Sequence, residues 1–219
     1  MKKYLEILRR CPLFDGIADD ELVRMLTCLG ARTRTVDKKE TIIDEGEPIH
    51  NIGILLSGSA NVIGIDYEGN RSIISNINPS GLFVEDYACA EIKSLPVAVV
   101  ANDECEVMMI DRDHLLHTCQ NNCSFHQTLI FNLMRDLANK ALLFHGKIDI
   151  LSKRTTRERL LTYLGIVSAE RGEREFDIPF DRQELADYLE VDRSGLSVEI
   201  GKLKGEGIID CNKKHFVLY

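Results

Sequence analysis

A short segment near the carboxyl end combines an arginine, hydroxyl groups and lysines with an apolar stripe at helical spacing. Leu196, Ile200 and Leu203 recur at i, i+4 and i+7, which places them on one face of a helix. The residues left for the outer face are Arg193, Ser194, Ser197, Val198, Lys202 and Lys204. An arginine near a helix start can pair bidentately with O6 and N7 of guanine, whereas hydroxyls and lysines suit phosphates. This pattern predicts a helix that reads base edges in a DNA major groove.

Such a helix needs neighbours that present its first turns to the groove. Asp181 and Glu184 have the spacing of a capping box and predict a preceding short helix. Glu190 and Val191 turn the chain, and Asp192 can cap the second helix. The end of the chain, IIDCNKKHFVLY, alternates around a turn and predicts a small hairpin. Two short helices followed by a hairpin form a winged helix-turn-helix, and its predicted DNA-binding surface also includes Gln183, Lys213 and Lys214.

A long amphipathic helix is predicted upstream, from about residue 124 to residue 151. This stretch contains no proline and one glycine. Its apolar seam is predicted to consist of Ile130, Leu133, Leu137, Ala141, Phe144, Ile148 and Leu151. At a rise of 1.5 Å per residue the helix would be about 42 Å long, more than a small β unit can cover. We therefore expect the seam to pair with a second copy of the chain, although such a helix can also pack on its own sheet.

The first half of the chain has a sequence pattern typical of β-strands. From about residue 12 to residue 112, short apolar runs alternate with turn residues, and Gly46, Gly58, Gly69 and Gly81 recur every 11 to 12 residues. This spacing predicts an all-β barrel or sandwich. The fold class expected for the whole chain is therefore α+β, with a β effector domain, a long helix and a winged helix-turn-helix.

Charge and composition limit the classes of function. The chain has 219 residues and a formal net charge of −8, of which −7 lies in residues 1–152 and −1 in residues 153–219. A nucleic-acid surface is therefore expected only at the carboxyl end. No run of about 18 apolar residues occurs and the amino end is unlike a secretory signal, so we expect a cytoplasmic protein without a membrane partner. Seven scattered cysteines without a CxxC pair do not predict a disulfide framework.

The run QELADYLEVDRSGLSVEIGKLKGEGII resembles the DNA-binding signature of the cyclic-AMP receptor and FNR (CRP/FNR) family of bacterial regulators. The resemblance extends over CPLFDGIADDEL, KKETIIDEGEP and LLSGSANVI, and so over nearly the whole chain. It implies a homodimeric transcription regulator that binds double-stranded DNA and contacts RNA polymerase. The implied domains are a cyclic-nucleotide-binding-like double-stranded β-helix over residues 1–123, a dimerisation helix over 124–152 and a winged helix-turn-helix over 153–219.

Within this resemblance, three positions of the predicted recognition helix can be compared with the family. Arg193 matches the base-contacting arginine, whereas Ser194 replaces a common glutamate and Val198 a common second arginine. Val198 can still meet a thymine methyl group. The resemblance thus implies DNA reading with a target that differs from the family's usual sequence.

The expected effector pocket departs further from the family. The resemblance places it at Phe83, Val84, Glu85, Leu95 and Pro96. Glu85 is retained, but Val84 replaces a glycine, Leu95 the phosphate-binding arginine and Pro96 a hydroxyl residue, so a cyclic phosphate loses its counter-charge and donors. Lys93, two residues before Leu95, is one possible substitute for that counter-charge. We expect an effector other than cyclic AMP, and the sequence assigns no cofactor.

Parts of the sequence are also compatible with other functions. His114, His117, Cys119, Cys123 and His126 form a cluster that a metal-based or haem-based redox or gas sensor of the same fold could use. An FNR-type cluster is not expected, because only two cysteines precede the β region. A degenerate dimerisation module without specific DNA binding is a further alternative. Enzymatic activity is not expected, because the β region holds a single histidine and no hydrolase, zinc-protease or phosphate-loop motif occurs.

Overall fold

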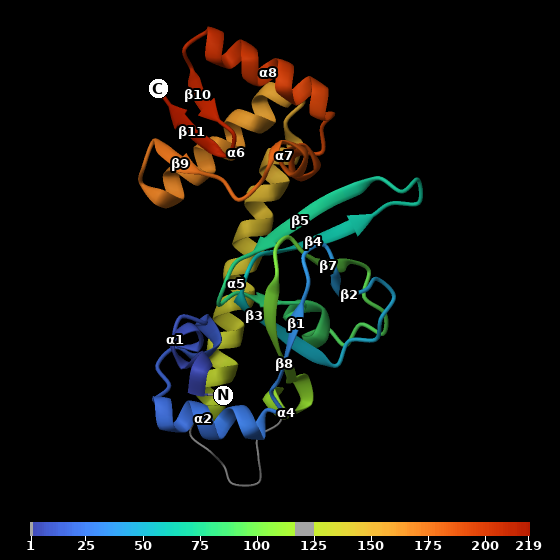
Figure 1. The fold of residues 1–219 in the computed structure, drawn as a ribbon, viewed down its shortest axis with the longest axis vertical. Helices are drawn as coiled ribbons and strands as arrows, with labels where there is room; N and C mark the ends of the chain where they lie inside the picture. Colours follow the sequence, from blue (N-terminus) through green and yellow to red (C-terminus); the bar gives the residue numbers. More distant parts are fainter. Residues whose placement is uncertain (1, 117–124) are drawn as a thin grey trace. The chain divides into compact units, whose positions relative to one another are not determined.

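The computed structural model describes residues 2–116 and 125–219, and the chain divides into two compact units (Figure 1). The first unit comprises Met1–Ile65 and Ile74–Asn139, and the second comprises Asp66–Ile73 and Lys140–Tyr219. The predicted fold class is confirmed, since an antiparallel β-roll, a long helix and a winged helix-turn-helix are all present. Among the described residues, none of the helices has the length and hydrophobicity that crossing a bilayer requires.

Two four-stranded sheets form the roll among the described residues, and residues 71–73 at the start of β5 are grouped with the second unit. One sheet has the order β1 (Arg32–Val36), β8 (Cys105–Asp111), β3 (Asn51–Ser57) and β6 (Leu82–Phe83). The other has the order β2 (Thr41–Ile43), β7 (Ala98–Ala101), β4 (Ala60–Ile65) and β5 (Arg71–Ile77). The central pair β3 and β8 is antiparallel, with Ile52 opposite Ile110 and Ile54 opposite Met108. These four side chains are fully buried, because each sheet turns an apolar face to the core.

Short helices surround the roll. Residues before β1 form the 3₁₀ turns η1 (Lys2–Tyr4) and η2 (Pro12–Phe14) and the helices α1 (Leu5–Leu8) and α2 (Asp19–Cys28). Helix α3 (Glu85–Cys89) follows β6, and α4 (Arg112–Leu116) follows β8. The buried apolar residues of these segments, such as Leu8, Leu13 and Met25, belong to the same core as the strands.

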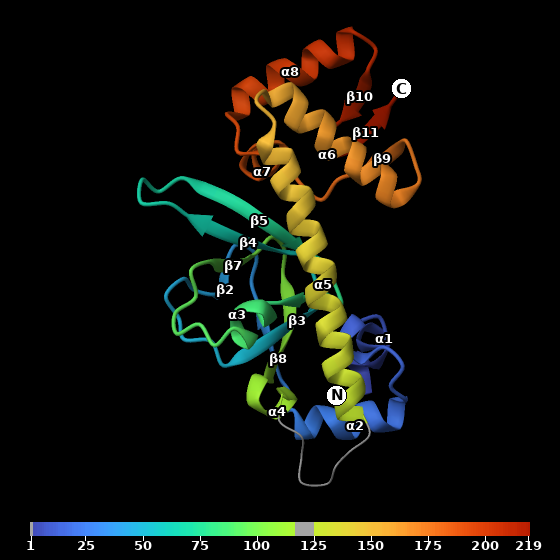
Figure 2. The same cartoon turned by 180° about the vertical axis from the view of Figure 1, so that it is seen from behind.

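The long helix α5 spans Phe125–Ser152, close to the predicted boundaries. Its first half lies beside α1 and α2 in both views (Figures 1 and 2) and contributes Leu129 and Leu133 to the core of the first unit. The amide of Asn132 donates hydrogen bonds to the backbone oxygens of Leu13 (3.0 Å) and Asp15 (2.8 Å). The first half of α5 is therefore an integral part of the β-roll unit.

The second unit contains the rest of α5 together with α6 (Thr156–Arg171), α7 (Arg182–Leu189) and α8 (Arg193–Gly205). Its sheet has the order β10 (Ile209–Asn212), β11 (His215–Leu218) and β9 (Glu175–Asp177). Leu160, Leu185, Leu203 and Phe216 are each no more than 1% exposed and form the centre of this unit. Helices α7 and α8 followed by the hairpin β10–β11 confirm the predicted winged helix-turn-helix.

Candidate nucleic-acid interface

The two helices of the motif begin and end as the sequence predicted. Asp181 and Glu184 form a complete capping box at the start of α7. Helix α7 ends at Glu190, whose backbone is left-handed (φ 51°, ψ 55°). Asp192 caps α8 by accepting a hydrogen bond of 2.7 Å from the N–H of Gly195, and hydrogen bonds from Ser194 and Gly195 hold the pKa of this carboxyl below its ordinary value. The turn between the helices is thus closed by local bonds on both sides.

Helix α8 presents one apolar face to the core and one polar face to solvent. Leu196 and Leu203 are fully buried and Ile200 is 4% exposed, which confirms the predicted inner face. All nine residues predicted to form the DNA-binding surface are exposed: Gln183, Arg193, Ser194, Ser197, Val198, Lys202, Lys204, Lys213 and Lys214. Val198 is 60% exposed, which leaves its side chain open to contact from outside.

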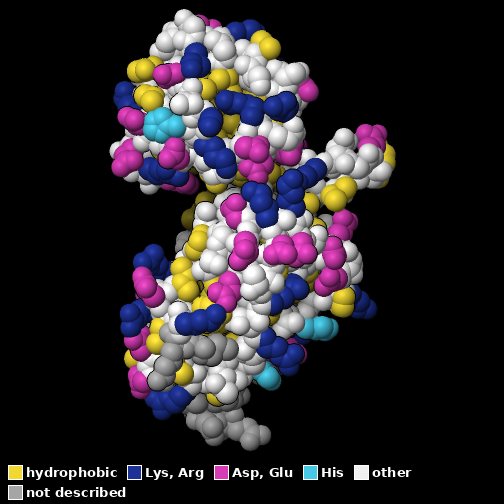
Figure 3. Space-filling view, in the orientation of Figure 1, with side chains coloured by type: hydrophobic (Ala, Val, Ile, Leu, Met, Phe, Trp, Pro, Cys, Tyr) yellow, Lys and Arg dark blue, Asp and Glu magenta, His cyan; other side chains and the backbone are white. Residues whose placement is uncertain are grey.

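Several lysines of this surface already have partners inside the unit. Lys202 pairs with Glu199 (3.2 Å), Lys204 pairs with Asp210 (2.8 Å), and Lys214 donates to the backbone oxygen of Pro179 (2.6 Å). Figure 3 accordingly shows lysine and arginine side chains interspersed with acidic ones over this unit. Exposed pairs of this kind exchange at little cost, so the lysines remain able to turn to phosphates. Within the part of the chain that the structure describes, Arg193 and Lys213 hold no ion pair.

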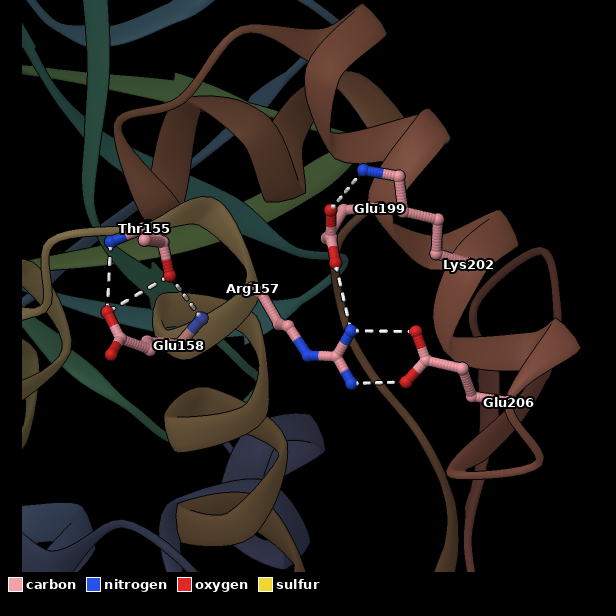
Figure 4. A network of polar contacts seen from close by, with 6 residues as sticks. All are labelled: Thr155, Arg157, Glu158, Glu199, Lys202 and Glu206. Atoms are coloured by element: carbon pink, nitrogen blue, oxygen red, sulfur yellow. Dashed lines mark hydrogen bonds and ion pairs between the residues drawn. The ribbon is translucent and has the colours of Figure 1, made fainter.

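A salt-bridge network that the sequence did not predict connects α6 and α8 (Figure 4). The guanidinium of Arg157 binds both carboxylate oxygens of Glu206, with 2.9 Å between Nη1 and Oε1, and lies 3.5 Å from Glu199. This contact lowers the pKa of Glu206 and raises that of Arg157. The partners lie 42 and 49 residues from Arg157, so no helical spacing reveals them. The network ties the start of α6 to the recognition helix α8.

The wing carries a histidine between two acids. The Nδ1 of His215 lies 3.0 Å from Asp177 and its Nε2 lies 3.1 Å from Glu175, so β11 is bonded to β9 through side chains as well as backbone. These hydrogen bonds, with Asp177 contributing most, raise the pKa of His215 above its ordinary value of 6.5. Because the folded state favours the charged form, this stabilisation is complete below about pH 6.5 and is lost as pH rises through the raised value.

We therefore expect the ring of His215 to titrate above 6.5 in an NMR pH series of the folded protein. The His215→Gln variant should show a smaller fall in melting temperature than the wild type between about pH 6 and about pH 8, because glutamine keeps a polar group but has no charge to lose. A His215 titration at or below 6.5 would contradict the assigned contacts with Asp177 and Glu175.

The exposed apolar face of α5 differs from the predicted seam. Leu133 is 3% exposed within the core of its own unit, so this part of the predicted seam requires correction. Leu137 packs against the same core, Ile130 and Leu151 are half-buried, and Ala141 is exposed. The exposed large apolar residues of α5 are Phe131, Met134, Leu142, Leu143, Phe144 and Ile148. Of these, only Phe144 and Ile148 belong to the predicted seam, because helical periodicity does not show which neighbouring stripe packs against the roll.

Most of the residues predicted to form the effector pocket are buried. Phe83, Val84, Glu85 and Leu95 are buried, whereas Pro96 is exposed. The ring of Phe83 lies so close to Gly53 that a Cβ there would come within 2.0 Å of it. The backbone N–H of Leu95 already donates to the backbone oxygen of Glu47 (2.9 Å). Val84 keeps a left-handed backbone (φ 56°), although a branched residue adopts it at a cost.

Two members of the predicted histidine and cysteine cluster are described. His126 is 2% exposed, and its Nε2 lies 3.3 Å from the backbone oxygen of His114. His117, Cys119 and Cys123 lie outside the described residues. Within residues 2–116 and 125–219, no group of three or more histidine, cysteine or acidic side chains is arranged to hold a metal ion.

Comparisons with known proteins agree with this architecture. A cyclic nucleotide-binding domain model matches residues 33–122, and a Crp-like helix-turn-helix domain model matches residues 158–218. Electron transport regulator A of Shewanella oneidensis is 21% identical over 193 residues, which cover 85% of this chain and 74% of that protein.

Two solved structures share the fold. FixK2 from Bradyrhizobium japonicum has a TM-score of 0.68 and 20% identity, and the match covers 86% of this chain and 92% of FixK2. The c-di-GMP responsive global regulator CLP of Xanthomonas campestris has a TM-score of 0.74 and 18% identity, covering 92% of this chain and 99% of CLP. At these identities the likeness shows the fold alone.

Proposed function

The chain belongs to the CRP/FNR family of transcription regulators, and on that basis we propose that it acts as a homodimer that binds specific DNA sequences under the control of an effector other than cyclic AMP. Family members are transcription regulators, not enzymes. A regulator of this kind would act on double-stranded DNA in the cytoplasm, with RNA polymerase as a further partner.

One observation carries the proposal of sequence-specific binding. Arg193 lies exposed in the first turn of α8, at the position where a helix entering the major groove contacts base edges. It holds no ion pair within the described residues, so its guanidinium is available for O6 and N7 of a guanine. The capped start and the buried inner face of α8 place this residue on the outward face of the first turn. The surrounding lysines, including the unpaired Lys213, then supply phosphate contacts that set the register.

The exposed face of α5 supports the proposal of a homodimer. Phe131, Met134, Leu142 and Ile148 lie within an arc of about 120° on the helix, at about 100° per residue, and each is more than half exposed. An apolar stripe of this length on a regulator of this family is best covered by the same stripe of a second copy, in a two-fold arrangement. Two copies would present two α8 helices to successive major grooves.

The proposed exclusion of cyclic AMP follows from the chemistry of the loop after α3. Leu95 offers no counter-charge and its N–H is engaged by Glu47, while Pro96 has no N–H to offer. A cyclic phosphate placed there would lose its water shell without gaining donors. The buried side chains of Phe83, Val84 and Leu95 favour an apolar or weakly polar effector. They are equally compatible with control by a signal that does not bind in this pocket.

Binding to DNA selected from a random pool tests the proposed function. We expect fluorescence anisotropy with the selected duplex to give a dissociation constant near 10⁻⁸ M, at least about 10³-fold tighter than for random DNA. Raising salt from about 50 to about 200 mM should weaken binding steeply, because lysines release counterions from phosphates. Weak binding that is equal on every sequence would instead favour a degenerate dimerisation module, the alternative that the exposed Val198 and the paired lysines support.

A further inference from the structure

Two positively charged side chains, those of Lys147 and Arg159, donate hydrogen bonds to the backbone oxygens at the carboxyl end of α7. At this end the chain turns into the recognition helix α8. The Nζ of Lys147, on α5, donates to the backbone oxygen of Tyr188. The Nη1 of Arg159, on α6, donates to the backbone oxygens of Leu189 (3.0 Å) and Glu190 (2.8 Å). The last carbonyls of a helix have no intrahelical donors and carry the negative end of its dipole. Lys147 and Arg159 thus act as external caps on three consecutive carbonyls.

The ammonium group of Lys147 has further contacts besides the backbone oxygen of Tyr188. Its Nζ also donates to the backbone oxygen of Ile73 (3.1 Å) and lies 3.5 Å from the centre of the Tyr188 ring. Tyr188 in turn stacks on Phe180, with ring centres 4.7 Å apart. The Nε of Arg159 bonds the backbone oxygen of Lys153 (3.0 Å), just beyond the end of α5. All these groups belong to the second unit, and none of these bonds is to a carboxylate.

We propose that Lys147 and Arg159 are positioning residues for DNA binding, which fix the direction of α8 relative to α5 by holding the turn at Tyr188–Glu190. This inference rests on the proposed function, in which α5 joins two copies and α8 reads bases. The turn is short and left-handed at Glu190, so a shift of the carbonyls at its start redirects the first turn of α8. In a dimer each copy carries its own α8, so a change in the direction of α8 occurs twice. The distance between the two recognition helices, which must be about 34 Å, then changes by twice the displacement of one helix.

The distinctive consequence concerns the spacing between half-sites rather than the reading of one half-site. We expect the wild-type protein to prefer its selected operator by at least about tenfold over the same operator with one base pair inserted at its centre. Lys147→Met keeps the length and apolar stem of the side chain but removes its donors and charge. This variant should bind a single half-site as the wild type does, yet discriminate between the two spacings by no more than about threefold.

A matched control lies nearby. Lys153 follows α5 directly, and among the described residues its side chain pairs with Asp149 (2.9 Å), so Lys153→Met removes a lysine side chain without touching the turn. It should keep the wild-type preference for spacing. Lys147→Arg, which retains charge and donors, should restore most of that preference. If Lys147→Met is folded and dimeric but retains full spacing discrimination, the proposal is overturned; if the wild type shows no specific binding at all, both this proposal and the proposed function fail.

A pH series provides a second readout, independent of whether Lys147→Met folds. Burial lowers the pKa of Lys147 to about 8, with Glu190 opposing and Arg159 reinforcing the effect. The charge is therefore present below about pH 8 and lost above it. Tyr188 and Tyr163 remain neutral in this range, because burial raises the pKa of both hydroxyls. Spacing discrimination should fall between about pH 7 and about pH 9 in the wild type but not in Lys147→Arg, which stays charged; an equal pH response in both proteins would contradict the role of Lys147.

Discussion

Replacing Ile148 with aspartate is expected to convert the protein to monomers and to lower its affinity for the selected operator by at least about 10²-fold. Ile148 is 64% exposed on α5, in the arc that also holds Phe131, Met134 and Leu142. If this arc is covered by a second copy, the variant buries a carboxylate from each copy in an apolar seam, which costs several kcal/mol per ion. Loss of the dimer leaves each α8 to bind its half-site alone.

Light scattering gives the mass of this variant directly. Asn139→Asp is the matched control, because it adds the same charge to an exposed position of α5 outside the apolar arc. The control should keep the wild-type mass and affinity. An Ile148→Asp variant with unchanged mass would show that this face of α5 does not join two copies.

The second large effect is expected at the recognition helix. Arg193→Ala should relax the preference at one base pair of each half-site by about 1–3 kcal/mol, while binding to random DNA changes little. The reason is that a guanidinium paired bidentately with guanine contributes mainly to discrimination between bases. Affinities for duplexes that carry each of the four bases at that position measure the effect.

Lys213→Ala separates base reading from phosphate contact. Lys213 lies exposed at the tip of the β10–β11 hairpin, so its loss should weaken binding to all sequences alike and reduce the salt slope by about one. If Arg193→Ala also weakens binding equally on every sequence, direct reading of a base by Arg193 is contradicted.

The helix-turn-helix could be predicted from sequence because its determinants are local. The cap at Asp192 and the core positions Leu196, Ile200 and Leu203 lie within 12 consecutive residues, and all take the predicted roles. Helical periodicity and capping chemistry act over such distances. The contacts that hold this motif in place are different, since Lys147 reaches Tyr188 and Arg157 reaches Glu206 across more than 40 residues.

At two further places, α5 and Val84, the structure differs from what the sequence predicts, and in both places the cause is packing against distant residues. On α5, apolar residues occur around most of the helix, and only the packing of Leu129 and Leu133 into the first unit decides which stripe remains exposed. At Val84, the left-handed backbone persists although the residue there is branched, because burial on both sides fixes the chain. Composition and spacing describe neither of these effects.

Hydroxyl-radical footprinting of the protein on its selected operator tests the central claim most directly. Two copies joined through α5, each with α8 in a major groove, should protect two patches on the same side of the duplex, one helical turn or about 34 Å apart. A single protected patch, or protection spread evenly along the duplex, would contradict a dimer that reads DNA through paired recognition helices.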